Sequence, residues 1–206
     1  MNHRIFIAIN LPKELKEKLC SYRNYWPEVP ARWVKPENLH LTLVFLGYIK
    51  EKDLIKILEA TEKTASEHKI FSIDFNKICY GPPQKSSPLT KESSEDYLFK
   101  GNKLPRLIWV EGNLNKNLIA LRNDLEKKLE DGNISFLKEN REFKPHITLA
   151  RINTWEFKKL EPEERPEINE KIELKFEVKS IEVMESKLKR GGAEYAILKS
   201  AKLNKF

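Results

Sequence analysis

Apolar residues recur along this chain with two periods, and each period predicts a different kind of element. Isoleucine-rich or alternating runs, in which every second side chain shares a face, predict strands. The runs of this kind are Arg4–Asn10, Asn38–Gly47, Phe71–Tyr80, Arg106–Gly112, Lys144–Ile152, Ile172–Glu185 and Glu194–Lys202. Large apolar residues that repeat with the helical period predict helices. The segments of this kind are Lys13–Trp26, Lys50–Lys69 and Asn115–Glu130.

The order strand–helix–strand occurs twice, over residues 4–47 and 106–152. His40 and His146 lie in the second strand of the two units, about half a chain apart. An internal duplication at such a period predicts two lobes of similar design. The similarity is visible in the order of elements and in one short motif.

The duplication suggests how the domain is divided. We expect one bilobal domain over residues 1–206, with lobes of roughly 1–83 and 105–206, and we leave open whether strands exchange between the lobes. The polar, serine-rich segment 84–104 has no sustained period and is expected to form a surface insertion loop. A second polar stretch, 161–170, is expected to be a connector.

Composition and charge narrow the classes of protein. The 206 residues are 40% apolar and 33% charged, and 38 Lys and Arg against 31 Asp and Glu give a net charge of +7. The excess favours a polyanionic partner such as RNA, although a lysine-rich solvated surface explains it as well. The chain has no apolar run near 18 residues, and its apolar start is too short for a signal peptide. Cys20 and Cys79 form no disulfide framework, so we expect a soluble, reduced, cytoplasmic protein.

Two tetrapeptides share the pattern His, apolar, Thr, apolar: HLTL from His40 and HITL from His146. Because side chains two apart in a strand share a face, His40 shares a face with Thr42, and His146 shares one with Thr148. Two such strands facing each other would place two imidazoles and two hydroxyls around one cavity. One copy is a pattern of low specificity, whereas two copies in repeated units indicate function.

This set of groups suits acid–base chemistry on a phosphodiester. Histidine, with an ordinary pKa of about 6.5, gives or takes a proton near neutral pH. One imidazole can take a proton from the attacking oxygen while the other gives one to the leaving oxygen. Threonine hydroxyls can donate to the non-bridging oxygens, and a nearby Arg or Lys is expected to balance charge. Neither motif carries a carboxylate on its histidine face, and there is no glycine-rich phosphate loop, so we expect no metal and no cofactor.

At these residues the chain resembles the two-histidine phosphoesterases, and within them the bacterial and archaeal RNA 2′,3′-cyclic phosphodiesterases, historically called 2′-5′ RNA ligases. The similarity extends along nearly the whole chain. The similar segments are RIFIAINLPKELKEKL from Arg4, RWVKPENL from Arg32, FLG from Phe45, RLIWV from Arg106, FKP from Phe143, Ala150-Arg151, and ESKL from Glu185 with Gly192 and Tyr195. Family members usually have a short link where this chain has 84–104.

The resemblance implies an α+β fold: two lobes about a pseudo-two-fold axis, with antiparallel sheets lining a central cleft and helices outside. It implies hydrolysis of an RNA terminal 2′,3′-cyclic phosphate to a 2′-phosphomonoester, with water as nucleophile. The implied proton donor is His40 and the acceptor is His146, while Thr42, Thr148 and Arg151 would hold the phosphate. The implied partners are RNA ends that carry a cyclic phosphate, with tRNA fragments as candidates, and we expect a monomer.

Several features of this site stay open in the sequence. In a regular strand Arg151 shares a face with Ile147, away from His146, unless the strand is bulged or ends, or the side chain curls over the edge. Trp33 and Phe45 flank the first motif and are candidates for base stacking, although both are more often core residues. The same residues also suit a 2′-5′ RNA ligase acting on tRNA halves, or a non-catalytic RNA-binding module.

Overall fold

The strands pair into one antiparallel sheet. The computed structural model describes residues 2–82, 104–138, 143–190 and 192–205. Within these residues nine strands follow the order β7-β4-β5-β6-β3-β1-β8-β9, with β2 paired to β6. Their bounds are β1 Asn2–Asn10, β2 Ala31–Trp33, β3 His40–Lys50, β4 Phe71–Gly81, β5 Leu107–Gly112, β6 His146–Ile152, β7 Asn169–Val178, β8 Ser180–Lys189 and β9 Gly192–Lys202. The helices are α1 Lys13–Ser21, α2 Glu51–Glu67, α3 Lys116–Asp131 and α4 Thr154–Lys159, with short 3₁₀ turns η1 Tyr22–Tyr25, η2 Pro36–Asn38 and η4 Pro162–Glu164.

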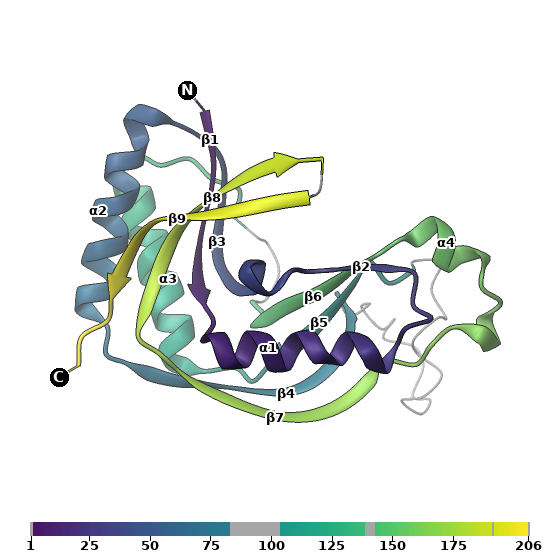
Figure 1. Cartoon of the computed structure of the whole chain (residues 1–206). Helices are drawn as coiled ribbons and strands as arrows, with labels where there is room; N and C mark the ends of the chain where they lie inside the picture. Colours follow the sequence, from purple (N-terminus) through teal and green to yellow (C-terminus); the bar gives the residue numbers. More distant parts are fainter. Residues whose placement is uncertain (1, 83–103, 139–142, 191, 206) are drawn as a thin grey trace, which may run out of the picture.

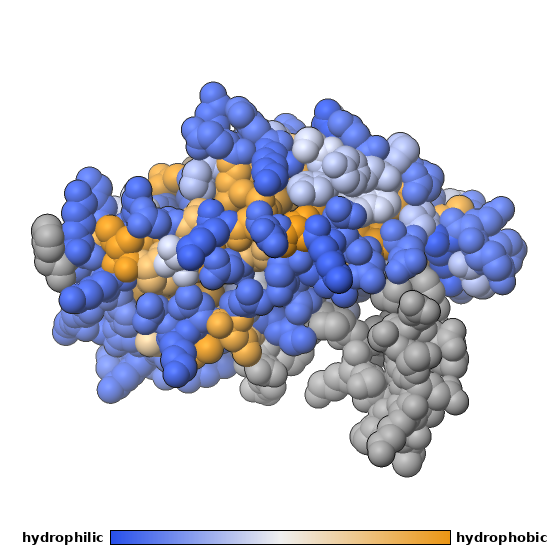
Figure 2. Space-filling view, turned by 90° about the horizontal axis from the view of Figure 1, so that it is seen from below, coloured by the Kyte–Doolittle hydropathy of each residue, from blue (hydrophilic) through white to orange (hydrophobic). Residues whose placement is uncertain are grey.

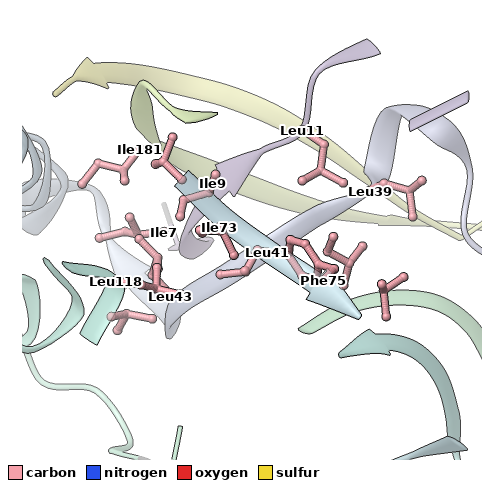
Figure 3. Packing of buried hydrophobic residues seen from close by; sticks show 14 of the residues in the cluster. Ile7, Ile9, Leu11, Leu39, Leu41, Leu43, Ile73, Phe75, Leu118 and Ile181 are labelled. Carbon is pink, nitrogen blue, oxygen red and sulfur yellow. The ribbon is translucent and has the colours of Figure 1, made fainter. Parts of the chain in front are cut away.

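Helices α2 and α3 pack side by side against one face of the sheet (Figure 1). The buried residues on this face come from strands far apart in the sequence, and Leu43 lies near Leu118 of α3 (Figure 3). The same strand positions that alternate apolar and polar in the sequence alternate buried and half-buried in the structure. The apolar face of the sheet is therefore covered, and its histidine-bearing face is left for polar groups.

The two repeated units occupy neighbouring halves of the sheet. In the first unit β1 pairs antiparallel with β3, and in the second β5 pairs antiparallel with β6. Strands exchange between the halves: β4 pairs with β5 and β7, whereas β8 and β9 extend the sheet beyond β1. The α+β class, the antiparallel pairing and the repeated unit are confirmed. Each half of the sheet contains strands from distant parts of the sequence, because strand pairing, and not order along the chain, decides to which half a strand belongs.

Some predicted element bounds differ from the structure. The predicted strand Ile172–Glu185 is divided between β7 and β8. β7 pairs with β4 and β8 pairs with β1, so a single alternating run in the sequence forms two strands in different parts of the sheet. The predicted helix Lys13–Trp26 ends as an α-helix at Ser21 and continues as η1. β2 and α4 were not predicted, because three and six residues are too few to show a period. Apart from Leu104, the predicted insertion Gln84–Leu104 lies outside the described residues.

One face of the molecule is mainly polar. Figure 2 shows one face on which hydrophilic residues predominate and hydrophobic residues form small patches between them. Among the residues that the structure describes, no helix is long and apolar enough to cross a membrane.

Leu41→Ala should lower the free energy of unfolding by about 2–5 kcal/mol, because it leaves a cavity where β3 meets β6. The Leu41 side chain is fully buried, at 0% exposure. Leu137→Ala is the matched control, because Leu137 is 90% exposed and its truncation should change stability by less than about 0.5 kcal/mol. Urea unfolding followed by circular dichroism measures both, and equal effects would contradict the assignment of Leu41 to the core.

Candidate active site

The two motif strands meet side by side in the middle of the sheet. β3 and β6 pair antiparallel with Leu41 opposite Ile147, which are the residues directly after the two histidines. Both apolar side chains are 0% exposed. His40 and His146 are half-buried and lie on the opposite face of the sheet. The pairing of equivalent residues places a local pseudo-two-fold axis between the two motifs.

The motif threonines lie across from the histidines. Continuing the register of β3 and β6 by one residue places His40 opposite Thr148 and Thr42 opposite His146. Such cross-strand neighbours have Cβ atoms about 4.5–5.5 Å apart. Within the first motif, His40 Nε2 is also 3.0 Å from Thr42 Oγ1. The four groups predicted from the two motifs therefore meet on one face.

A backbone carbonyl two residues upstream orients each histidine. His40 Nδ1 lies 2.7 Å from the carbonyl oxygen of Asn38, and His146 Nδ1 lies 2.8 Å from that of Lys144. A carbonyl oxygen only accepts, so Nδ1 is the donor in both rings. In the neutral imidazole Nε2 is then unprotonated, and it can accept a proton as a base or, once protonated, donate one as an acid. Both halves of the molecule offer the same ring nitrogen for chemistry.

A β-bulge follows each motif and turns later side chains onto the histidine face. The β1–β3 register skips Leu43, and the β5–β6 register skips Leu149. An extra residue in one strand shifts its alternation by one. Phe45 and Arg151, at equivalent positions after the two motifs, are therefore exposed on the histidine face. Of the possibilities left open for Arg151, the bulged strand is the one found.

Other elements hold the carbonyl groups of the bulged residues. Arg122 Nε of α3 donates to Leu43 O at 3.0 Å, and the backbone N–H of Val34 donates to Leu149 O at 2.8 Å. A buried carbonyl without a partner would cost about 1–3 kcal/mol. These two hydrogen bonds therefore stabilise the bulges and fix the direction of the side chains that follow them.

The environment of His40 keeps its ring neutral over a wide pH range. Burial lowers the pKa of His40 from 6.5 to about 4, because a charged ring loses water. The hydrogen bond to the Asn38 carbonyl raises this pKa, while the positive charges of Lys16, His146 and Arg151 lower it further. Residues from α1, β3 and β6 thus act on one imidazole, which indicates that they surround a common site.

Aromatic rings support both imidazoles. The His40 ring centroid lies 4.9 Å from that of Phe6 and 5.2 Å from that of Tyr195. Phe6 and Tyr195 belong to a small apolar cluster separate from the main core. On the other side, the His146 ring lies 4.3 Å from the buried Trp109 indole. The supporting rings come from β1 and β9 in one half and from β5 in the other.

The Trp109 indole is itself held in place. Its Nε1–H donates to Cys79 Sγ at 3.2 Å, which gives the buried indole nitrogen a partner. A Cβ atom added at Gly81 would overlap the indole ring, so glycine leaves the room that this ring occupies. β4 thus fixes the ring against which His146 packs.

Trp33 lies on the other side of the sheet. It is paired in register with Ala150, whose side chain is buried, and it packs against the main core. With Leu39 and Leu149 it lines a cavity of about 470 Å³ beside α1. Because successive side chains of a strand point to opposite faces of the sheet, Arg32 of β2 lies on the face of Arg151 and Trp33 does not. The stacking role considered for Trp33 is therefore not supported by its position, whereas Phe45 is on the histidine face.

Two residues near His40 were missed by the sequence analysis. Lys16 of α1 donates from Nζ to the carbonyl oxygen of Glu37 at 3.1 Å, and Asn38 Nδ2 donates to the carbonyl oxygen of Ala193 at 2.8 Å. Both bonds hold the η2 turn whose carbonyl orients His40. Lys16 is one of many lysines in its segment, so no sequence signal marked it. Asn38 is two residues before the motif, and that proximity was a usable signal.

The paired motif and the antiparallel fold place the chain among the two-histidine phosphoesterases. The model of the LigT like phosphoesterase family matches residues 9–90 and 108–195, and the chain belongs to this family. It is 28% identical to an RNA 2′,3′-cyclic phosphodiesterase of Methanocaldococcus jannaschii, over 95% of this chain and 98% of the relative. It is 31% identical to one of Escherichia coli, over 72% of this chain and 71% of the relative.

Solved structures share the fold. A crystal structure from Thermus thermophilus matches with a TM-score of 0.76 at 24% identity, covering 98% of both chains. The crystal structure of Escherichia coli LigT complexed with 3′-AMP matches with a TM-score of 0.71 at 24% identity, covering 100% of both chains.

The His40 ring should titrate near pH 4 in the free protein, and His146→Ala should raise its pKa, because a neighbouring positive charge is removed. Since the native pKa lies below the unfolded value of about 6.5, the native state binds fewer protons in this window. The stability contributed by His40 is therefore present above pH 6.5 and is lost as the pH falls toward 4. NMR titration of the ring signals measures the pKa, and a value near 6.5 would contradict the buried environment.

Proposed function

We propose that this protein is an RNA 2′,3′-cyclic phosphodiesterase that converts a terminal cyclic phosphate into a 2′-phosphomonoester. The observation that carries this proposal is the pair of imidazoles on one sheet face, each oriented through Nδ1 by the carbonyl two residues upstream. Two relatives, which match 95% and 72% of this chain, are named RNA 2′,3′-cyclic phosphodiesterase. The positive net charge is in keeping with an RNA substrate.

In the proposed reaction the two histidines act on opposite oxygens of the phosphate. Nε2 of His146 takes a proton from water as its oxygen attacks phosphorus. The bond from phosphorus to the 3′ oxygen breaks, and this oxygen takes a proton from Nε2 of His40. The proton count balances, because one histidine gains the proton that the other has lost. Thr42, Thr148 and Arg151 donate hydrogen bonds to the non-bridging oxygens, whose negative charge Arg151 also offsets.

The low pKa of His40 places a condition on its role as donor. Near neutral pH the free protein holds this ring neutral, so an acid must acquire its proton when the substrate binds. An anionic phosphate beside the ring favours the imidazolium form and raises its pKa. The charges of Lys16 and Arg151, which disfavour a protonated His40 in the free protein, are offset by the same phosphate. We therefore propose that substrate binding charges His40 for the reaction.

The decisive assay uses a short RNA that ends in a 2′,3′-cyclic phosphate, with EDTA present and ATP absent. A 2′-phosphate product supports the proposal. Addition of an RNA with a 5′-hydroxyl end tests the reverse chemistry, and a 2′-5′ linked product would favour an RNA ligase. Tight binding without turnover would favour a non-catalytic RNA-binding module, and loss of turnover in EDTA would contradict the metal-independent mechanism.

His40→Ala and His146→Ala should each lower kcat on the order of 10²-fold or more, the usual effect of removing a general acid or base. A substrate whose 3′ leaving oxygen is replaced by sulfur distinguishes the roles, because a thiolate leaves without a proton. His40→Ala should recover most of its loss on this substrate, whereas His146→Ala should not. Recovery by His146→Ala instead would exchange the two roles. His68→Ala serves as the control and should retain full activity. His68 directly follows α2, and its Nε2 lies 3.1 Å from Asp124 Oδ2.

We propose that Phe45 offers a stacking surface to the terminal base. Its ring is 46% exposed, and the Arg4 guanidinium carbon lies 5.0 Å from the ring centroid. Stacking on an aromatic ring accepts any base, so the four terminal bases should give similar kcat/KM values. Phe45→Ala should raise KM on the order of 10-fold, in line with about 1–3 kcal/mol per stacked base. A strong preference for one base, or an unchanged KM in Phe45→Ala, would contradict this role.

A further inference from the structure

Two arginines face each other at the end of the motif strand β6. Arg32 of β2 is paired in register with Arg151, and both side chains are exposed. A guanidinium group suits bidentate binding of phosphate, so two arginines in register at this strand end, one of them proposed to hold the reacting phosphate, suit a nucleic acid strand that carries more than one phosphate.

The arginine pair continues a row of cross-strand pairs along β6. The row on the histidine face begins with His146 opposite Thr42, continues with Thr148 opposite His40, and ends with the arginine pair. On the neighbouring strand β5, Trp109 and Leu107 are the partners of Thr148 and Arg151. Thr148 and Arg151 are three residues apart with the bulged Leu149 between them, so the two pairs lie about 7–10 Å apart, of the order of the spacing between successive phosphates in a nucleic acid strand.

The Arg32 guanidinium also lies beside the half of the sheet that carries His40. A Cβ atom added at Gly192 would overlap it, so the side chain passes against the backbone at the start of β9. The next residue, Ala193, accepts a hydrogen bond from Asn38, whose own carbonyl orients His40. Arg32 therefore lies beside the contact between the η2 turn and the start of β9, next to the residues that orient His40.

We infer that Arg32, together with Arg151, binds the phosphate on the 5′ side of the terminal nucleotide of the RNA. The inference rests on the proposed function, since it extends the same site by one nucleotide. Arg151 contacts the reacting phosphate and the neighbouring one, whereas Arg32 contacts the neighbouring one. The protein then favours RNA ends over 2′,3′-cyclic mononucleotides, because a mononucleotide has no phosphate for Arg32 to bind.

The test compares three substrates in wild type and Arg32→Gln. These are a 2′,3′-cyclic mononucleotide, a dinucleotide with the same terminal cyclic phosphate, and that dinucleotide with a neutral methylphosphonate as its internal linkage. Arg32→Gln should lower kcat/KM for the dinucleotide on the order of 10-fold, as for loss of a hydrogen bond to a charged group. It should leave the mononucleotide unchanged, and it should add no further loss to that caused by the methylphosphonate.

Two controls separate this role from charge and from structure. Lys63→Gln removes one positive charge from exposed α2, which packs on the other face, and should affect all three substrates equally and weakly. Arg32→Lys keeps the charge but loses the planar donor pair, so it should retain part of the dinucleotide preference. A plot of log kcat/KM against log salt concentration has a negative slope, and for the dinucleotide this slope should be shallower by about one in Arg32→Gln than in the wild type.

Each outcome bears on the inference separately from the proposed function. An equal loss on mononucleotide and dinucleotide in Arg32→Gln would show a role at the reacting phosphate or in holding the β9 hairpin, and would overturn it. So would an unchanged dinucleotide rate, or additive losses from Arg32→Gln and the methylphosphonate. If the wild type turned over none of the substrates, the proposed function itself would fail.

Discussion

The pairing of Leu41 with Ile147 is the contact on which the site depends. These two residues join the halves of the sheet, and their burial fixes which face of β3 and β6 points into the core. A shift of one residue in this register would turn both histidines toward the helices, because the side-chain period of a strand is two. The two histidines, which are the acid and the base of the proposed reaction, are thus placed by a hydrophobic contact between other residues.

The two bulges extend the site beyond the motifs. Without Leu43 and Leu149 as extra residues, strict alternation would direct Phe45 and Arg151 away from the histidine face. The equivalent positions carry different residues, an aromatic ring in one half and a guanidinium in the other. A duplicated framework therefore holds the same ring nitrogens twice but presents different side chains beside them, and in the proposed function one of these binds a base and the other a phosphate.

Supporting residues differ between the halves in the same way. The ring of His40 packs against Phe6 and Tyr195, while that of His146 packs against Trp109. The two imidazoles have the same hydrogen-bonding scheme at Nδ1 but different surroundings. In the proposed reaction such a difference separates acid from base, since two groups in identical environments would have equal affinities for a proton.

The sequence by itself determined the repeated unit and the common face of histidine and threonine in each motif, because strand alternation is a local property. The antiparallel α+β class came from the resemblance to the two-histidine phosphoesterases, because alternation does not fix the direction in which strands pair. The sequence did not determine that β4 joins the second half and β8 the first, since strand pairing depends on contacts between distant residues. The position of Arg151 was also undecided, because a bulge appears only in the register of two strands. The same holds for Trp33 and Arg32: the three residues of β2 show no period, and pairing with β6 decided which of the two faces the site.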